Sequence, residues 1–118
     1  MLLVIRGELT SLNEYINAER TNRFRAAKIK KEETERIYYE CKEQKLKRIS
    51  KPREAIFTWF SKNERKDFDN IEFAQKFIWD GLVMAGVLLS DTQKDTPRVR
   101  IHNHEIDKKK PRVELELI

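Results

Sequence analysis

The sequence predicts a mixed α/β domain in the order βαβαββ, because short apolar runs typical of strands alternate with longer segments of helical periodicity. A length of 118 residues suits one compact domain, and no repeat or low-complexity linker divides the chain, so residues 1–118 are interpreted as a single domain. Hydrophobic residues make up 39% and charged residues 38%, which predicts a modest core under a densely charged surface.

Four strand-like segments and two helical segments make up this order. The strand-like segments are rich in branched apolar residues or alternate apolar and polar side chains, and a turn at residues 108–111 joins the last two. A further apolar run at residues 87–89 is interpreted as a short strand that leads to Asp91. The main strands are expected at residues 2–5, 55–60, 98–104 and 112–118, and the helices at residues 12–44 (interrupted near 20–23) and 70–85.

Capping residues predict where the helices begin and end. Ser11 and Glu14 have the spacing of a capping box, which places a helix start at residue 12. Gly86 lies where the C-terminal cap of the second helix is expected. Apolar residues at helical spacing give that helix one packed face. They are Ala74, Phe77, Ile78, Gly81, Leu82 and Ala85.

The composition favours a soluble, cytoplasmic protein. No apolar run approaches the length of a membrane span, and residues 1–5 are too short for a signal peptide. Cys41 is the only cysteine, which excludes an internal disulfide and fits a reducing compartment. We interpret Cys41 as a packed thiol rather than a nucleophile, because no acid–base partner lies near it in the sequence.

Positive charge is concentrated in one part of the chain. The net charge is +5, whereas residues 20–53 hold 13 basic and 5 acidic side chains, a local net of +8. Such a block suits a polyanion, because each neutralised phosphate releases condensed counterions. A solvated helix surface with Glu–Lys pairs is the other interpretation. The cations expected to contact nucleic acid are Arg20, Arg23, Arg25, Lys28, Lys30 and Lys31.

Asp67 and Asp69 lie two residues apart, directly before the second predicted helix. In an extended segment, residues i and i+2 point to the same side, and two carboxylates there repel each other unless a cation lies between them. Hard oxygen ligands of this kind suit magnesium or manganese. The alternative is that Asp69 only caps the helix and Asp67 is solvated.

Other candidate residues follow downstream. Lys76 and Asp80 are four residues apart on the helix, which also fits a simple surface salt bridge. Asp91 follows an apolar run, a usual place for a ligand carboxylate. His102 and His104 form an H-x-H pair, for which ordinary surface positions are the more frequent interpretation and metal binding the less frequent one.

Three ordered segments carry a resemblance to a known family. They are KDFDNI at residues 66–71, KFIWDGL at 76–82 and AGVLLSD at 85–91. Together they resemble the RusA family of Holliday junction resolvases, above all its members from Gram-positive bacteria and their phages. The segment LNEYIN at residues 12–17 is similar to the same subgroup, as are the basic residues that follow it.

The resemblance implies a RusA-like homodimer that uses Mg²⁺, or Mn²⁺ as a substitute, to resolve Holliday junctions by paired symmetric nicks. It implies a role in DNA recombination and repair in the cytoplasm of a bacterial cell or a phage-infected host, with four-way or branched DNA as partner and no membrane. By match of position, Asp67, Asp69 and Asp91 would hold the metal. Lys76 would be the essential lysine, and Asp80 the recurrent helix aspartate.

The length of the second predicted helix limits how these carboxylates can meet. A continuous helix over residues 70–85 would be roughly 24 Å long. The chain from Ala85 to Asp91 reaches at most about 20 Å. One chain therefore scarcely brings Asp91 back to Asp69, and we expect Asp91 to be donated across a dimer interface. A shorter or broken helix is the alternative.

Two other classes of function compete. A non-catalytic DNA-binding phage accessory protein would share the basic block without needing the aspartates. An RNA-binding module is disfavoured, because the aromatic residues do not form an evident stacking platform. Metal dependence separates these classes, since a binding module keeps its affinity in chelator and cuts nothing.

Overall fold

One four-stranded mixed sheet organises the protein, and the computed structural model describes all residues from 1 to 118. The predicted mixed α/β class is confirmed. The structure has two helices at each place where the sequence predicted one. In chain order, the elements are β1 (Leu2–Arg6), α1 (Leu12–Thr21), α2 (Arg23–Glu43), β2 (Glu54–Ser61), α3 (Phe68–Glu72), α4 (Gln75–Met84), β3 (Val99–Ile106) and β4 (Arg112–Leu117).

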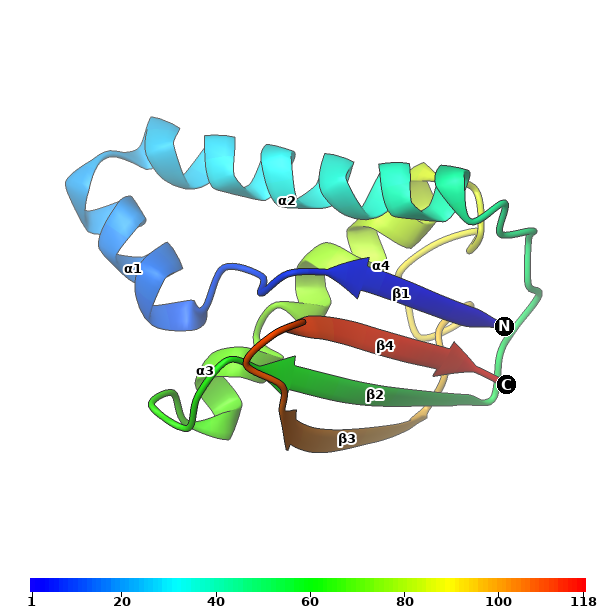
Figure 1. Ribbon diagram of the computed structural model, residues 1–118. Coiled ribbons are helices and arrows are strands. Elements are labelled where there is room, and N and C mark those ends of the chain that lie inside the picture. The colour runs from blue at the N-terminus through cyan, green and yellow to red at the C-terminus, as the bar shows by residue number, and fades with distance from the viewer.

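The strands lie in the spatial order β1-β4-β2-β3. β4 is antiparallel to both β1 and β2, whereas β3 is parallel to β2. The predicted turn at residues 108–111 therefore joins strands that lie on either side of β2 and do not pair with each other. Both chain termini lie at the same end of the sheet (Figure 1).

The core lies between the sheet and the helices. In β2 and β4 every second side chain is buried, as the alternation of the sequence predicts. In Figure 1, α4 lies behind the sheet and α2 runs beside β1. The predicted apolar face of the second helix is confirmed, because five of its six residues are buried and Ala85 is partly buried. Ile37 and Cys41 of α2 also belong to this core.

Side chains of α2 cover the free edge of β1. The side-chain amide of Gln44 accepts a hydrogen bond from the Val4 N–H (3.0 Å) and donates one to the Val4 carbonyl (2.6 Å). The Glu40 carboxylate accepts from the Arg6 N–H (2.9 Å). An edge strand normally exposes these backbone groups, so α2 satisfies them in place of a fifth strand.

The start of α1 and the end of α4 agree with their predicted caps. Ser11 and Glu14 form the capping box before α1. Gly86, with φ of 75°, ends α4: its N–H bonds to the Val83 carbonyl (3.0 Å), and the Val87 N–H bonds to the Leu82 carbonyl (2.9 Å). This pair of bonds forms a Schellman motif. Every helix falls short of a membrane span, in length or in apolar character.

Two predictions about the second half of the chain are wrong. Residues 87–89 are not a strand, because Val87 and Leu88 follow the Schellman turn directly and are buried in the core without strand pairing. The helix predicted at residues 70–85 is interrupted. At Phe73 and Ala74 the backbone bonds shorten to an i, i+3 pattern, as in Ala74 N–H to the Ile71 carbonyl (3.2 Å), which separates α3 from α4.

Candidate active site

Asp67 and Asp69 lie at the start of α3, but not in an extended segment. Asp67 is the N-cap of α3, and its carboxylate accepts a hydrogen bond from the Asn70 N–H at 2.8 Å. Asp69 is already inside the first turn of the helix, and its side chain is exposed. The expected extended geometry is therefore wrong, and the capping role falls to Asp67 rather than to Asp69. The two carboxylates crowd the positive end of one short helix.

The buried side chain of Asn70 joins this corner to α1. Its Oδ1 atom accepts a hydrogen bond from the Asn13 N–H at 2.9 Å. Tyr15 of α1 also packs against Phe73, with ring centroids 5.4 Å apart. Because α1 leads directly into α2, the basic segment is held in a fixed relation to Asp67.

A histidine of β3 anchors the other side of α3. His104 Nε2 lies 2.5 Å from a carboxylate oxygen of Glu72, and the pair is mostly buried. The His104 ring stacks on Phe68, with centroids 4.2 Å apart, and Phe68 stands between the two aspartates in the sequence. Phe68 and His104 border an open hollow of about 680 Å³ that also includes Asp67 in its lining.

His102 has a different partner from His104. Its Nδ1 accepts a hydrogen bond from the Trp59 indole N–H at 3.0 Å, and its ring stacks on Phe57. Burial lowers the pKa of His102. The two imidazoles of the H-x-H pair are thus bound to separate protein groups, which fits two packed histidines.

The second acidic position lies between α4 and the loop after it. Asp80 of α4 is half-buried, and the exposed Asp91 carboxylate lies close enough to influence its pKa. Burial raises the pKa of Asp80, and Asp91 raises it further, while Lys30 and Lys76 act in the opposite direction. Two carboxylates so close cannot both ionise without cost unless a cation lies beside them.

Lys30 of α2 lies on the same hollow as Asp80. This hollow of about 510 Å³ runs between α2 and α4 and includes Lys31 and the half-exposed Met84 in its lining. Apolar residues near Lys76 and Asp80 in the sequence differ in burial. Trp79 and Val87 are buried in the chain's own core, whereas Met84 is exposed. Lys30 and Lys31 of the basic segment therefore border Asp80 directly.

The five candidate catalytic residues form two groups within one chain. Asp67 and Asp69 lie at α3, whereas Asp80 and Asp91 lie together with Lys76 nearby. Within one chain, no three Asp, Glu, His or Cys side chains come close enough to hold a metal ion together.

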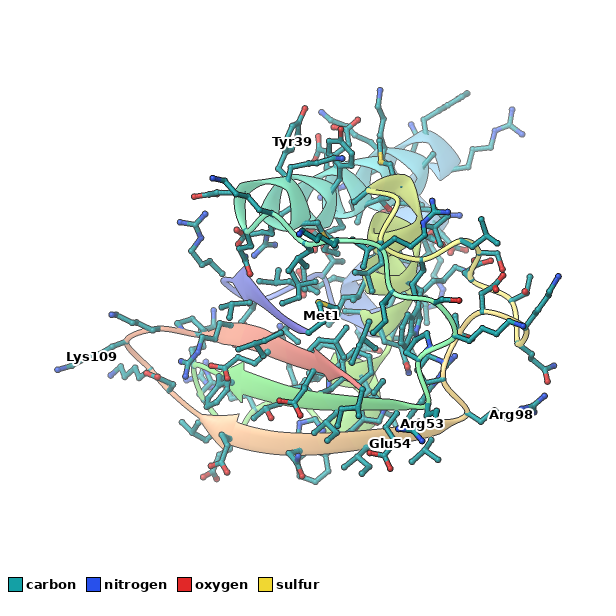
Figure 2. The ribbon with its side chains drawn as sticks, turned by 90° about the vertical axis from the view of Figure 1, so that its right-hand side faces the viewer. Met1, Tyr39, Arg53, Glu54, Arg98 and Lys109 are labelled. Atoms are coloured by element: carbon teal, nitrogen blue, oxygen red, sulfur yellow. The ribbon has the colours of Figure 1, made fainter.

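All six predicted DNA-contacting cations are exposed. Lys28 has a carboxylate within 4 Å, that of Glu32 at 3.8 Å, and the other five have none. Side chains of this kind extend outward from the helices and turns, as Lys109 also does at the tip of the turn between β3 and β4 (Figure 2). Five of these six cations therefore lie on the solvated surface without an ion pair.

Sequence reasoning missed the partners that hold these residues. Glu72 and His104 are 32 positions apart, and Lys30 is 50 positions from Asp80, so no local pattern signals either contact. Asn70, which follows the D-x-D motif directly, was the one signal in the sequence for a residue that holds this corner in place. Cys41 is confirmed as a packed thiol, because it is 1% exposed and burial raises its pKa to about 11.

No protein-family model matches the chain, and no curated protein sequence is significantly similar to it.

Proposed function

We propose that the protein is a magnesium-dependent endodeoxyribonuclease that resolves four-way DNA junctions by paired symmetric nicks, in the cytoplasm and in the service of DNA recombination and repair. The observation that carries the proposal is the half-buried Asp80, whose pKa stays raised by burial and by the neighbouring Asp91 although Lys30 and Lys76 act to lower it. Asp80 also borders the exposed Lys30 and Lys31. The ordered resemblance to the RusA family supports it from the sequence.

The donor atoms fit a hard divalent cation. Asp67, Asp69 and Asp91 offer carboxylate oxygens, the ligands that Mg²⁺ and Mn²⁺ prefer, and a cation beside Asp91 would relieve its repulsion with Asp80. When bound, the metal supplies a more acidic water and stabilises charge on the phosphate. Lys76 is exposed and would place its ammonium where negative charge develops on the phosphate oxygens.

The basic segment would hold the DNA backbone. Arg20, Arg23 and Arg25 are exposed near the corner between α1 and α2, and Lys30 and Lys31 extend the positive surface towards Asp80. Contacts of this kind position a duplex without reading its sequence.

We further propose that each active site is shared between two chains. Asp69 and Asp91 belong to separate acidic groups within one chain, so a partner's Asp91 would complete the site that begins at α3. A twofold dimer would then carry two identical sites, which paired symmetric nicks require. Met84, which is 52% exposed beside Asp80, is an apolar side chain available to such an interface.

A nicking assay tests the proposed activity. Wild-type protein and Asp69→Asn would be incubated with a mobile four-way junction and with linear duplex of matched sequence, in Mg²⁺ and in chelator. We expect paired nicks on the junction in Mg²⁺ alone, and their loss in the variant. Tight junction binding without cutting under any divalent metal would contradict the proposal.

The second candidate is a non-catalytic DNA-binding accessory protein. One observation favours it: the carboxylates needed for a metal site are not gathered within one chain, whereas the cations are exposed and mostly free of ion pairs. It predicts binding that chelator leaves unchanged, and wild-type affinity in Asp69→Asn.

A further inference from the structure

Phe24 is an exposed aromatic residue at a projecting corner of the protein. Its side chain is 69% exposed, more than any other large apolar side chain of the chain. It lies in the first turn of α2, and the corner between α1 and α2 projects beyond the sheet (Figure 1). Burying a phenylalanine ordinarily contributes about 2 kcal/mol, so this ring gives the fold almost none of its usual stabilisation.

The backbone beneath Phe24 is rigidly held. Asn22, which separates the two helices, donates its N–H to the Ala18 carbonyl (2.9 Å) and accepts from the Phe24 N–H through Oδ1 (2.8 Å). Ala26, one residue beyond Arg25, is buried and fixes the first turn of α2 against the protein. The ring is therefore presented outward by a capped helix rather than by a loose loop.

Cations surround this ring. Arg23 and Arg25 flank Phe24 in the sequence, and Arg20 lies in the last turn of α1. All three are exposed without a carboxylate within 4 Å. The Arg23 guanidinium lies 5.2 Å from the centre of the Phe24 ring. The first turn of α2 holds no acidic residue, although the helix dipole favours acids and disfavours cations there. The corner thus accumulates positive charge at some cost to helix stability.

An aromatic face within a positive field suits one class of ligand. Nucleic acid offers both complements, since phosphates neutralise the cations and each base has a face on which a ring can stack. In a continuous duplex, every base face is already covered by its neighbours. At an open branch point the base pairs of adjoining arms are not held in one continuous stack, so exposing a base face costs less there than inside a duplex.

We propose that Phe24 stacks on a base at the branch point of a DNA junction while the neighbouring arginines hold the phosphates of the arms. The inference rests on the proposed function and assigns the preference for branched DNA to a side chain outside the acidic groups. α1 connects this corner to Asn70, next to the aspartates of α3, so a branch held at Phe24 would have a fixed relation to the cutting site.

The test compares Phe24→Ala with Phe24→Tyr and with Tyr39→Ala. Tyr39 is a matched control, because it is 64% exposed on the same helix and points away from the protein in Figure 2. Affinity would be measured for a four-way junction and for linear duplex, with 2-aminopurine at the branch as a fluorescent reporter of stacking. All of these positions are exposed, so each variant should keep the unfolding midpoint of the wild type.

We expect Phe24→Ala to lose about tenfold in junction affinity and to lose the 2-aminopurine signal, with linear-duplex affinity unchanged. Phe24→Tyr should retain both, and Tyr39→Ala should behave as wild type. Unchanged junction affinity in Phe24→Ala, or an equal loss on linear duplex, overturns the inference while leaving the proposed nuclease intact. A wild-type protein that neither prefers nor cuts junctions overturns the proposed function and this inference together.

Discussion

Carboxylates occur in two regions of this protein under opposite conditions. Along the inner side of α2, Glu33 and Glu40 are buried and each is fully matched by hydrogen-bond donors. Between α4 and the following loop, Asp80 is half-buried beside a second carboxylate, and burial raises its pKa. The glutamates of the first region stabilise the fold through hydrogen bonds. The acidic pair of the second region makes no such contribution to the fold.

The partners of the glutamates explain their role. Glu40 accepts hydrogen bonds from the Arg6 backbone N–H and guanidinium. Burial acts to raise the pKa of Glu40, but the contacts with Arg6 hold this pKa below its ordinary value. Glu33 accepts from the Thr10 N–H at 2.7 Å and from Arg36 at 3.2 Å. Both carboxylates attach α2 to the chain around β1. A buried carboxylate that has its own hydrogen-bond donors is therefore structural. A pair of carboxylates without such donors is a candidate for binding a cation.

The largest expected effect is on activity at the unmatched acids. Asp91→Asn and Asp69→Asn should each lower junction cleavage at least a hundredfold, because each removes a charged metal ligand, while the unfolding midpoint stays close to that of the wild type. Nicking rates in saturating Mg²⁺ and thermal unfolding of the same preparations measure the two quantities. Cleavage at wild-type rates in both variants would contradict a catalytic role for these two carboxylates.

The matched acids should show the reverse behaviour. Glu40→Ala leaves the Arg6 N–H at the edge of β1 without its acceptor, so the free energy of unfolding should fall by about 1–3 kcal/mol. Denaturant unfolding measures the loss. At a temperature where the variant is folded, its junction cleavage per folded molecule should equal that of the wild type, and a selective loss of cleavage would argue against a purely structural Glu40.

The smallest effect concerns the pH dependence of stability. Asp80 has a raised pKa, so its contribution to stability is present in acid and is lost as the pH rises through that pKa. Asp80→Asn should therefore stabilise the metal-free protein at pH 7 by less than about 1 kcal/mol, because the group is partly solvated, and the gain should vanish below about pH 4.

Glu40 provides the opposite control for this measurement. Its lowered pKa means that its contribution is present at neutral pH and is lost in acid, so the deficit of Glu40→Ala should shrink as the pH falls. Urea unfolding of both variants between pH 3 and 7 would show the two trends. Parallel trends would contradict the assignment of opposite pKa shifts.

Local sequence rules predicted the elements well and failed where long-range packing decides. The capping box at Ser11, the cap at Gly86 and the apolar face of α4 are each set by residues close in sequence. The placement of β4 between β1 and β2 joins residues over a hundred positions apart, which periodicity does not encode. Residues 87–89 look like a strand because they are apolar, but their burial comes from packing after the Schellman turn.

The candidate site shows the same division. The sequence order of the aspartates pointed to the acidic residues, and the fold keeps Asp80 and Asp91 together. The capping role of Asp67 depends on where α3 begins, and a helix that began two residues later would give this role to Asp69. The Glu72–His104 pair joins α3 to β3 and becomes visible only once the strand order is known.

In our proposal, the two separate acidic groups act as one metal site that is shared between two chains. Mixing the inactive variants Asp69→Asn and Asp91→Asn tests it most directly, with junction nicking in Mg²⁺ as the readout and each variant alone as control. If sites are shared, a mixed dimer holds one site with both ligands intact, and single-strand nicking returns. If every mixture stays inactive while exchange of subunits is demonstrated with tagged chains, the site lies within one chain and the account is contradicted.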